Sequence, residues 1–176
     1  ELLKRLSRQT RPVRRIIVMN TRTETDVQAL LADCPKAELH ELDKNEFDHG
    51  GTRDAGARLS DADYLLFLTQ DALPADEYLV ERLAAAFTEP QIKAAYARQL
   101  ARPDCRELER YTRIFNYPEE SRVKTAADLD TLGIKTFFCS NVCAMYERET
   151  YVNQGGFIRK TIFNEDMIYA GGLIKA

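Results

Sequence analysis

The sequence lacks several features that mark other classes of protein. Its 25 Lys and Arg residues are fewer than its 28 Asp and Glu residues, whereas nucleic-acid-binding proteins usually show a basic excess. No apolar run approaches the ~18 residues that a membrane-spanning helix requires. The N-terminal residues mix leucines with Lys4, Arg5 and Arg8, which is not the pattern of a signal peptide. We therefore expect no nucleic-acid partner and at most peripheral contact with a membrane.

Cysteine is also sparse. The four cysteines, at positions 34, 105, 139 and 143, do not form the dense framework of a small disulfide-bonded domain, and this usage fits a reducing cytoplasm. Cys139 and Cys143 have no His or further Cys at the spacing of a zinc site. We expect both to be small buried side chains.

Hydrophobic residues make up 44% of the 176 residues, which is enough for one core. Because there is no internal repeat, low-complexity segment or linker, residues 1–176 are predicted to form a single domain. Strand and helix patterns alternate, with strands expected at residues 14–19, 37–42, 63–69 and 94–98 and helices at 1–9, 25–33, 52–60 and 76–87. This alternation predicts an α/β fold with a mostly parallel sheet flanked by helices.

The pattern changes after Arg98. Residues 103–125 are charged and aromatic, and could either cover the sheet or line a cleft. Residues 135–146 form a small additional β-like region, and Glu165 begins a last helix. The first helix has no N-terminal cap, and residues 171–176 end within a helical pattern. We therefore expect a fragment truncated at both ends, with a strand preceding Glu1.

The first candidate site follows the strongest strand pattern. Thr69, Gln70 and Asp71 come directly after an apolar run, and ligands of such sheets bind at the carboxyl ends of the strands. Mg²⁺ and Mn²⁺ take oxygen ligands, often one or two carboxylates together with substrate phosphates. Asp71 is thus a candidate metal ligand, although it could equally cap the helix that follows. The same rule directs attention to Asn20, after the first expected strand.

The second candidate site is the segment from His49 to Ala57, HGGTRDAGA. Its glycines, Gly50 and Gly51, precede a helix, where the backbone can approach a ligand and the helix N-terminus attracts anions. Arg53 adds a forked cation that suits a phosphate. An ordinary loop-to-helix junction with a surface arginine is the alternative interpretation.

The third candidate site is Phe163-Asn164-Glu165-Asp166. Asn164 is a plausible N-cap, and acids are favoured in the first turn of a helix whatever their function. A carboxylate at this position could also point into a cleft and accept a proton from a hydroxyl group.

Together the three sites have an order and spacing that resembles family 2 glycosyltransferases, which have the GT-A fold. The bacterial rhamnosyltransferase-like branch is the best match within that family. The resemblance runs over essentially the whole chain and is carried by residues 47–57 (FDHGGTRDAGA), 64–74 (YLLFLTQDALP), 138–141 (FCSN) and 155–157 (GGF), with the Glu165-Asp166 pair.

The resemblance implies a role for each matching residue. Asp71 stands at the last acid of the Asp-x-Asp motif that contacts the metal, and Thr69 replaces the first acid. Asp166 matches the catalytic base, in a pair with Glu165. Donor binding is implied for Arg53, Gly51, Thr52, Asn20 and Gln70, and acceptor binding for Ser140, Asn141, Gly156 and Phe157. Met19 and Asn20 replace the acids that usually contact the base or the ribose.

The activity implied by the resemblance is inverting sugar transfer from a nucleoside-diphosphate sugar, with dTDP-rhamnose as the candidate donor and Mg²⁺ or Mn²⁺ as the cofactor. The acceptor would be a hydroxyl of a saccharide or of a lipid-linked intermediate in bacterial surface polysaccharide synthesis. Such an enzyme is expected in the cytoplasm, with peripheral contact at the inner face of the plasma membrane.

Three other interpretations stay open. Because Thr69, Met19 and Asn20 replace the usual acids, the chain could instead be a non-catalytic nucleotide-sugar-binding domain. An Asp at a strand end followed by Pro74 is also typical of a receiver-like signalling domain, but the paired Glu165 and Asp166 would then be unexplained. A nucleotidyltransferase on a related fold would require a glycine-rich basic loop near its first strand.

Overall fold

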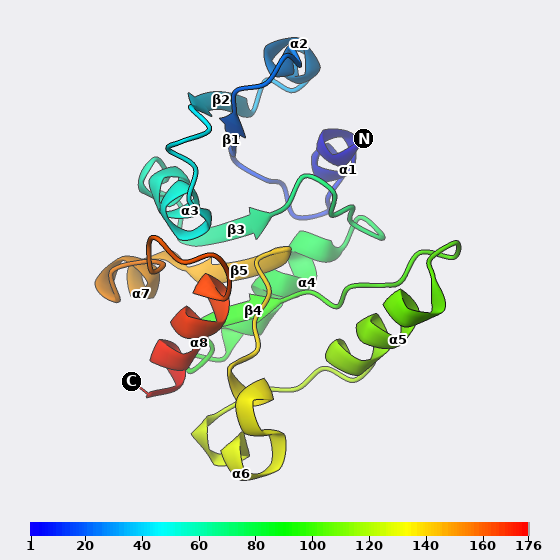
Figure 1. Ribbon diagram of the computed structural model, residues 1–176, viewed down its shortest axis with the longest axis vertical. Coiled ribbons are helices and arrows are strands. Elements are labelled where there is room, and N and C mark those ends of the chain that lie inside the picture. Colours follow the sequence, from blue (N-terminus) through cyan, green and yellow to red (C-terminus); the bar gives the residue numbers. More distant parts are fainter. Residues whose placement is uncertain (176) are drawn as a thin grey trace.

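The computed structural model describes residues 1–175 and contains two groups of strands (Figure 1). In the first group, β1 (Ile16–Thr21) pairs with β2 (Ala37–Leu42) in parallel, with Ile16 opposite Ala37. In the second group, the order is β3 (Tyr64–Leu68), β5 (Cys143–Glu147) and β4 (Ala94–Tyr96). Because β5 runs antiparallel to both neighbours, β3 and β4 run in the same direction. The expected α/β architecture with a parallel strand pair is present.

The expected β region at residues 135–146 lies further along the chain than its pattern suggested. Residues Gly133–Phe137 form a 3₁₀ helix, and the strand begins only at Cys143. This strand is no separate addition to the sheet, because it is the central member of the β3-β5-β4 group. Its residues Ala144, Met145 and Tyr146 are 0–3% exposed, which is the burial expected of a strand covered on both faces.

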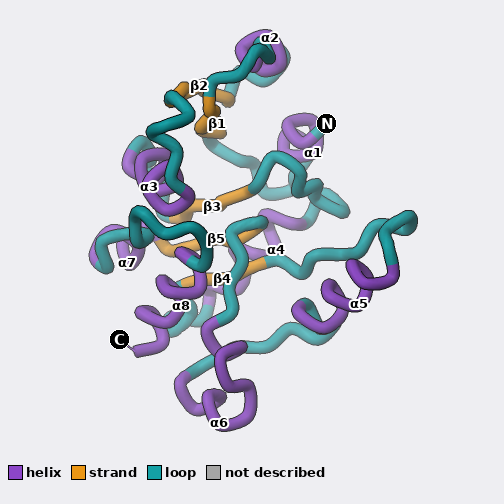
Figure 2. Tube along the Cα trace, viewed as in Figure 1, coloured by secondary structure: helices purple, strands orange, loops and turns teal. Residues whose placement is uncertain are grey.

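The helices are α1 (Leu2–Ser7), α2 (Val27–Leu31), α3 (His49–Arg58), α4 (Leu79–Ala85), α5 (Glu107–Asn116), α6 (Leu129–Leu132), α7 (Arg148–Asn153) and α8 (Glu165–Lys175). Helices α2 to α6 lie in the connections between the strands, α1 precedes β1, and α7 and α8 follow β5 (Figure 2). Within residues 1–175, no helix combines the length and the apolar character needed to cross a bilayer.

Several helices are shorter than their hydrophobic patterns indicated, because specific caps determine their ends. The side chain of Asp26 accepts a hydrogen bond from the backbone amide of Ala29 and caps α2. The start of α4 is delayed to Leu79, and the side chain of Gln9 accepts a hydrogen bond from the amide of Val80 at 3.0 Å. A buried glutamine from the loop after α1 thus satisfies one of the free amides of this helix end.

The core consists of two clusters on opposite faces of the β3-β5-β4 sheet. Side chains that alternate along β3 and β5 pack against α3, α7 and α8 on one face and against α4 on the other. The first face is rich in aromatic side chains in edge-to-face contact, with Phe67 and Tyr146 at 5.7 Å and Tyr146 and Tyr169 at 5.4 Å between ring centroids. Cys139 and Cys143 are buried in these clusters, as expected.

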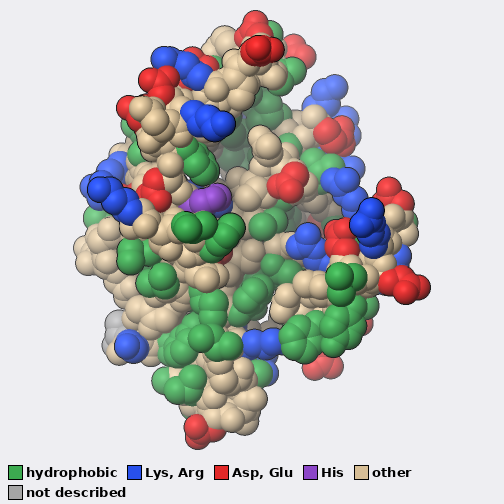
Figure 3. Space-filling view, in the orientation of Figure 1, with side chains coloured by type: hydrophobic (Ala, Val, Ile, Leu, Met, Phe, Trp, Pro, Cys, Tyr) green, Lys and Arg blue, Asp and Glu red, His purple; other side chains and the backbone are tan. Residues whose placement is uncertain are grey.

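Residues 103–125 divide into a helix that stands away from the sheet and a segment that packs on it. The helix, α5, buries none of its residues. Its outer face exposes Leu108, Tyr111, Ile114 and Phe115, and hydrophobic side chains gather over α5 in the space-filling view (Figure 3). Arg106 and Arg113 line a large open cavity together with Asp71.

The residues after α5 contact the sheet. Tyr117 is 6% exposed, and its ring lies 6.3 Å from that of Tyr96 on β4. The Lys124 ammonium lies 4.9 Å from the same Tyr96 ring. Both interpretations of this segment therefore apply, each to a different part of it.

Candidate active site

Asp71 lies two residues beyond the position where β3 leaves the sheet. The amide of Thr69 still bonds to the carbonyl of Val142 at 3.2 Å, and Asp71 then projects into a cavity of about 2100 Å³. The Thr69 hydroxyl, the Asp71 backbone amide and the charges of Arg102 and Arg113 lower the pKa of the Asp71 carboxyl, so it is ionised at neutral pH. The buried Thr69 hydroxyl lies close to the Asp71 carboxylate, but it makes no hydrogen bond of normal distance and angle within residues 1–175.

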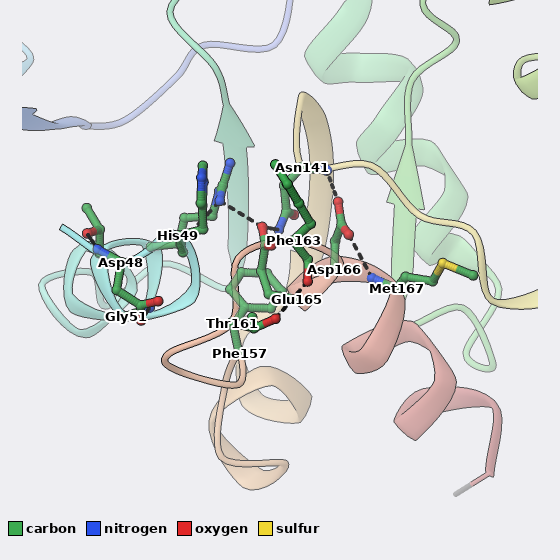
Figure 4. Close-up of polar contacts among 12 residues, drawn as sticks. Asp48, His49, Gly51, Asn141, Phe157, Thr161, Phe163, Glu165, Asp166 and Met167 are labelled. Atoms are coloured by element: carbon green, nitrogen blue, oxygen red, sulfur yellow. Dashed lines mark hydrogen bonds and ion pairs between the residues drawn. The ribbon is translucent and has the colours of Figure 1, made fainter. Parts of the chain in front are cut away.

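Asp166 lies in the first turn of α8, and its position is determined by two backbone amides (Figure 4). One carboxylate oxygen accepts from the amide of Asn141 at 2.9 Å, and the other accepts from the amide of Met167 at 2.8 Å. Burial and, less strongly, the charge of Glu165 raise the pKa of the Asp166 carboxyl, while the two amides and Arg53 oppose this shift. A fixed carboxylate with a raised pKa is chemically suited to accept a proton.

Glu165 is buried and is tied to two other site residues. Its Oε1 accepts from Arg53 at 2.7 Å and from the side-chain amide of Asn141 at 3.3 Å. The Asn141 side-chain oxygen in turn accepts from the hydroxyl of Tyr146 at 2.9 Å. This chain of hydrogen bonds joins the core of the sheet to Arg53 on α3, so Glu165 positions its neighbours and Asn141 contacts both acids.

The N-terminus of α3 departs from the expectation for Gly51 and Thr52. Asp48 caps this helix: its side chain accepts from the amide of Gly51 at 2.7 Å, and its carbonyl accepts from the amide of Thr52 at 2.8 Å. The backbone amides of Gly51 and Thr52 are therefore already used within the protein. The Arg53 guanidinium donates to the Glu165 carboxylate and also to the His49 carbonyl, the latter at 3.1 Å.

Phe157, which was expected to contact the acceptor, is a core residue in this structure. Its side chain is 2% exposed and packs edge-to-face against Tyr151, with 5.0 Å between the ring centroids. Gly156 has a φ of +75°, and a Cβ at this position would lie 2.0 Å from a carboxylate oxygen of Asp54. The Gly155–Phe157 turn therefore packs against Asp54 and the core instead of facing a ligand.

The remaining expected site residues lie in several parts of the structure. Asn20 is the penultimate residue of β1, in the two-stranded sheet, and its side-chain nitrogen is buried without a partner in the described residues. Gln70 is exposed between Thr69 and Asp71. Ser140 is nearly buried, and its hydroxyl accepts from the side chain of Gln99 at 3.1 Å. Asn164, expected as an N-cap, adopts a φ of +69°, and its carbonyl accepts from the amide of Ile168 at 2.9 Å.

Two hydrogen bonds, through the neighbouring residues Asn141 and Val142, link the end of β3 to the start of α8. Thr69 bonds to Val142, and the preceding residue, Asn141, bonds to Asp166. Asp71 and Asp166, distant in the sequence, therefore lie at the same edge of the β3-β5-β4 sheet. This edge is where ligands bind in α/β folds.

A family model described as Glycosyl transferase family 2 matches residues 1–153. The chain belongs to glycosyl transferase family 2. It is 38% identical over 176 residues to the O-antigen chain rhamnosyltransferase RfbN of Salmonella typhimurium, an alignment that covers 99% of this chain and 56% of that relative. The chain thus spans little more than half the length of this relative.

Two solved structures of low sequence identity share the fold of this family 2 chain. The structure of S. aureus TarS 1-349 has a TM-score of 0.72 and 15% identity, and covers 99% of this chain and 50% of that chain. The mannosyltransferase PcManGT from Pyrobaculum calidifontis, in complex with GDP-Man and Mn²⁺, has a TM-score of 0.66 and 17% identity, and covers 98% and 46%. The GT-A fold expected from the sequence is thereby confirmed.

A divalent metal is implied by this fold, and the residues of the family 2 chain fit one only in part. Within residues 1–175, no group of three or more His, Cys, Asp or Glu side chains could hold an ion alone. Asp71 nevertheless offers an ionised, exposed carboxylate beside the unpartnered hydroxyl of Thr69. This set suits Mg²⁺ or Mn²⁺ that is held jointly with the oxygens of a substrate diphosphate.

The part of the site that the sequence did not indicate is the support of the two acids. Asn141 was expected to contact the acceptor, but it is 2% exposed and bonds to both Glu165 and Asp166. Asp48 was not singled out, although an Asp three residues before a glycine at a helix start is a recognisable capping signal.

Proposed function

We propose that the protein containing this chain is an inverting glycosyltransferase, with Asp166 as its catalytic base. The observation that carries the proposal is the Asp166 carboxylate. Two backbone amides hold it, and burial raises its pKa. It lies at the same edge of the sheet as the ionised Asp71. A base and a diphosphate-facing carboxylate at one edge are what displacement at a sugar carbon requires.

In the proposed reaction, the oxygen of an acceptor hydroxyl attacks the anomeric carbon of the donor sugar. The bond from that carbon to the diphosphate oxygen breaks on the opposite face, and the nucleoside diphosphate leaves with the electron pair. Asp166 accepts the hydroxyl proton. Arg53, whose guanidinium is held by Glu165, opposes the negative charge that develops on the diphosphate. A divalent ion bound with Asp71 would supply further electrostatic stabilisation of that charge.

The donor is proposed to be a nucleoside-diphosphate deoxyhexose, specifically dTDP-rhamnose. The support is the 38% identity to a relative named as an O-antigen chain rhamnosyltransferase. The acceptor is proposed to be a saccharide hydroxyl of a lipid-linked intermediate in surface polysaccharide synthesis. The enzyme would then act in the cytoplasm, in peripheral contact with the inner face of the membrane.

The test is transfer by the full-length enzyme carrying Asp166→Asn. We expect the transfer rate to fall on the order of 10²–10⁴-fold while donor affinity in calorimetry stays nearly unchanged. Asp61→Asn is the matched control, because Asp61 is an exposed carboxylate paired only with the equally exposed Arg14. A wild-type transfer rate in Asp166→Asn would refute the assignment of the base.

A second candidate function is non-catalytic nucleotide-sugar binding. It is favoured by the single carboxylate at the strand end, where Thr69 stands in place of a second acid. The same assay separates the two functions: a full-length protein that binds nucleotide sugars with Mn²⁺ present but neither transfers nor hydrolyses them supports the second candidate.

A further inference from the structure

Three ring-bearing side chains, Phe47, His49 and Phe163, form a cluster that we call the aromatic rim. The ring centroids of Phe47 and His49 are 5.0 Å apart, and those of His49 and Phe163 are 6.2 Å apart. Phe163 directly precedes the Asn164-Glu165-Asp166 segment, and His49 begins the helix whose Arg53 bonds to Glu165 at 2.7 Å (Figure 4). None of the three side chains has a role in the mechanism proposed above.

The rim leaves two large apolar side chains exposed to solvent. Phe163 is 70% exposed and Phe47 is 45% exposed, although each could bury an area worth about 1.5–3 kcal/mol. The His49 ring makes no hydrogen bond within residues 1–175, so its nitrogens are available to a ligand. Exposed aromatic rings beside a partly buried carboxylate are the environment that a sugar ring can fill, since a pyranose has an apolar C–H face and polar edges.

The backbone holds the rim in place. Asp48, which lies between Phe47 and His49, caps α3 with one carboxylate oxygen and accepts the amide of Lys160 at 3.0 Å with the other. One side chain therefore joins the base of Phe47 and His49 to the loop that carries Phe163. Gly50 permits this contact, because a Cβ there would lie 1.9 Å from the carbonyl oxygen of Ile158.

The loop that carries Phe163 is also strained. Lys160 has a φ of +58° and Asn164 a φ of +69°, values that side chains other than glycine rarely adopt. The hydroxyl of Thr161 donates to the carbonyl of Phe163 at 2.8 Å and closes the loop between them. Such backbone strain persists where surrounding contacts enforce it, and it concentrates at ligand sites.

We propose that the aromatic rim is a pyranose-binding platform. Phe163 and Phe47 pack against the C–H face of the sugar ring next to Asp166, and the free His49 ring hydrogen-bonds a hydroxyl on the edge of that sugar. The proposal rests on the proposed transfer function. The sugar is either that of the donor or that of the acceptor, because both rings meet at Asp166 during transfer and present the same chemistry to the rim.

The experiment compares Phe163→Ala, Phe163→Tyr and Ile162→Ala in the full-length enzyme, with KM determined separately for donor and acceptor. We expect Phe163→Ala to raise one of these KM values by about 3- to 10-fold with kcat nearly unchanged, and Phe163→Tyr to restore it. Ile162→Ala is the matched control, because Ile162 is 78% exposed in the same loop and belongs to no ring contact. His49→Gln, which keeps a hydrogen-bonding group, should affect the same KM less than His49→Ala.

Calorimetry distinguishes the two sugars without turnover. If the rim holds the donor sugar, Phe163→Ala weakens binding of the nucleotide sugar but not of the nucleoside diphosphate alone. If it holds the acceptor sugar, Phe163→Ala leaves the affinities for the nucleotide sugar and for the nucleoside diphosphate unchanged. In that case the KM for the acceptor rises. Thermal unfolding serves as the folding control, since an exposed side chain should leave it unchanged.

The outcomes separate this proposal from the one on which it rests. Unchanged KM values in Phe163→Ala, or equal changes in Ile162→Ala, in an enzyme whose wild type transfers sugar would overturn the platform alone. A wild type that neither binds nor transfers from any nucleotide sugar would overturn both proposals.

Discussion

Removing the Asp54 carboxylate should destabilise the protein, because this buried acid joins α3 to the turn before α8. Its side chain is 2% exposed, accepts from the Tyr151 hydroxyl at 3.2 Å, and pairs with Arg58 at 3.2 Å and Arg159 at 2.8 Å. It also fills the space that a Cβ would occupy at Gly156. Each of these contacts is lost in Asp54→Ala.

The size of the effect follows from which partner is buried. Tyr151 is 2% exposed, so its hydroxyl would lose its acceptor away from water, at a cost of roughly 1–3 kcal/mol. The arginine side chains are 65% and 61% exposed, and solvent screening limits each pair to at most about 1 kcal/mol. We therefore expect Asp54→Ala to lower the free energy of unfolding by about 2–4 kcal/mol.

Urea unfolding of a double-mutant cycle with Tyr151→Phe measures the buried part of this energy. The double variant should cost less than the sum of the single variants by about 1 kcal/mol, since no hydroxyl is then left without an acceptor. Asp61→Ala removes an exposed carboxylate and should change stability by less than about 0.5 kcal/mol. Strictly additive costs for Asp54→Ala and Tyr151→Phe would refute the reasoning.

Two further predictions concern the acids of the site. Asp71→Ala should weaken Mn²⁺-dependent binding of a nucleoside diphosphate, and calorimetry with and without Mn²⁺ checks this; equal affinities would discard the metal role. The second prediction concerns pH: Asp166 must be ionised to act as a base, so kcat/KM should fall as the pH drops through its raised pKa. Glu165→Gln removes a neighbouring negative charge that raises this pKa, so the acidic limb of the profile should move to lower pH; a limb that moves upward would contradict the assignment.

The sequence predicted those elements whose signal is local. The apolar run that predicted a strand at residues 63–69 forms β3 at Tyr64–Leu68, and the acids expected to begin the last helix begin α8. The helix ends were less predictable, because tertiary caps such as Gln9 on Val80 determine them. Such a cap depends on how the loop after α1 packs against α4, and hydrophobic periodicity carries no information about it.

The surroundings of the expected site residues depend on tertiary packing in the same way. Phe157 follows two glycines in a motif associated with function, and the aromatic side chains that bury it come from β3, β5, α7 and α8. Gly51 begins a helix whose cap, Asp48, accepts the Gly51 amide. The burial of Phe157 depends on elements far away in the sequence, whereas an Asp before a helix start is a local capping signal.

The register of β5 places Asn141, which holds the Asp166 carboxylate, close to the end of β3. Leu68 pairs with Cys143, so the residues just outside the ladder, Thr69 and Val142, meet as the strands end. Asn141 then reaches Asp166. An antiparallel slip of two residues would keep every side chain on its own face but move Asn141 by about 7 Å along β3, which is too far for its hydrogen bond to Asp166. The buried side chains that prevent this slip, with Ala144 and Tyr146 both 0% exposed, therefore determine the geometry of the base without touching it.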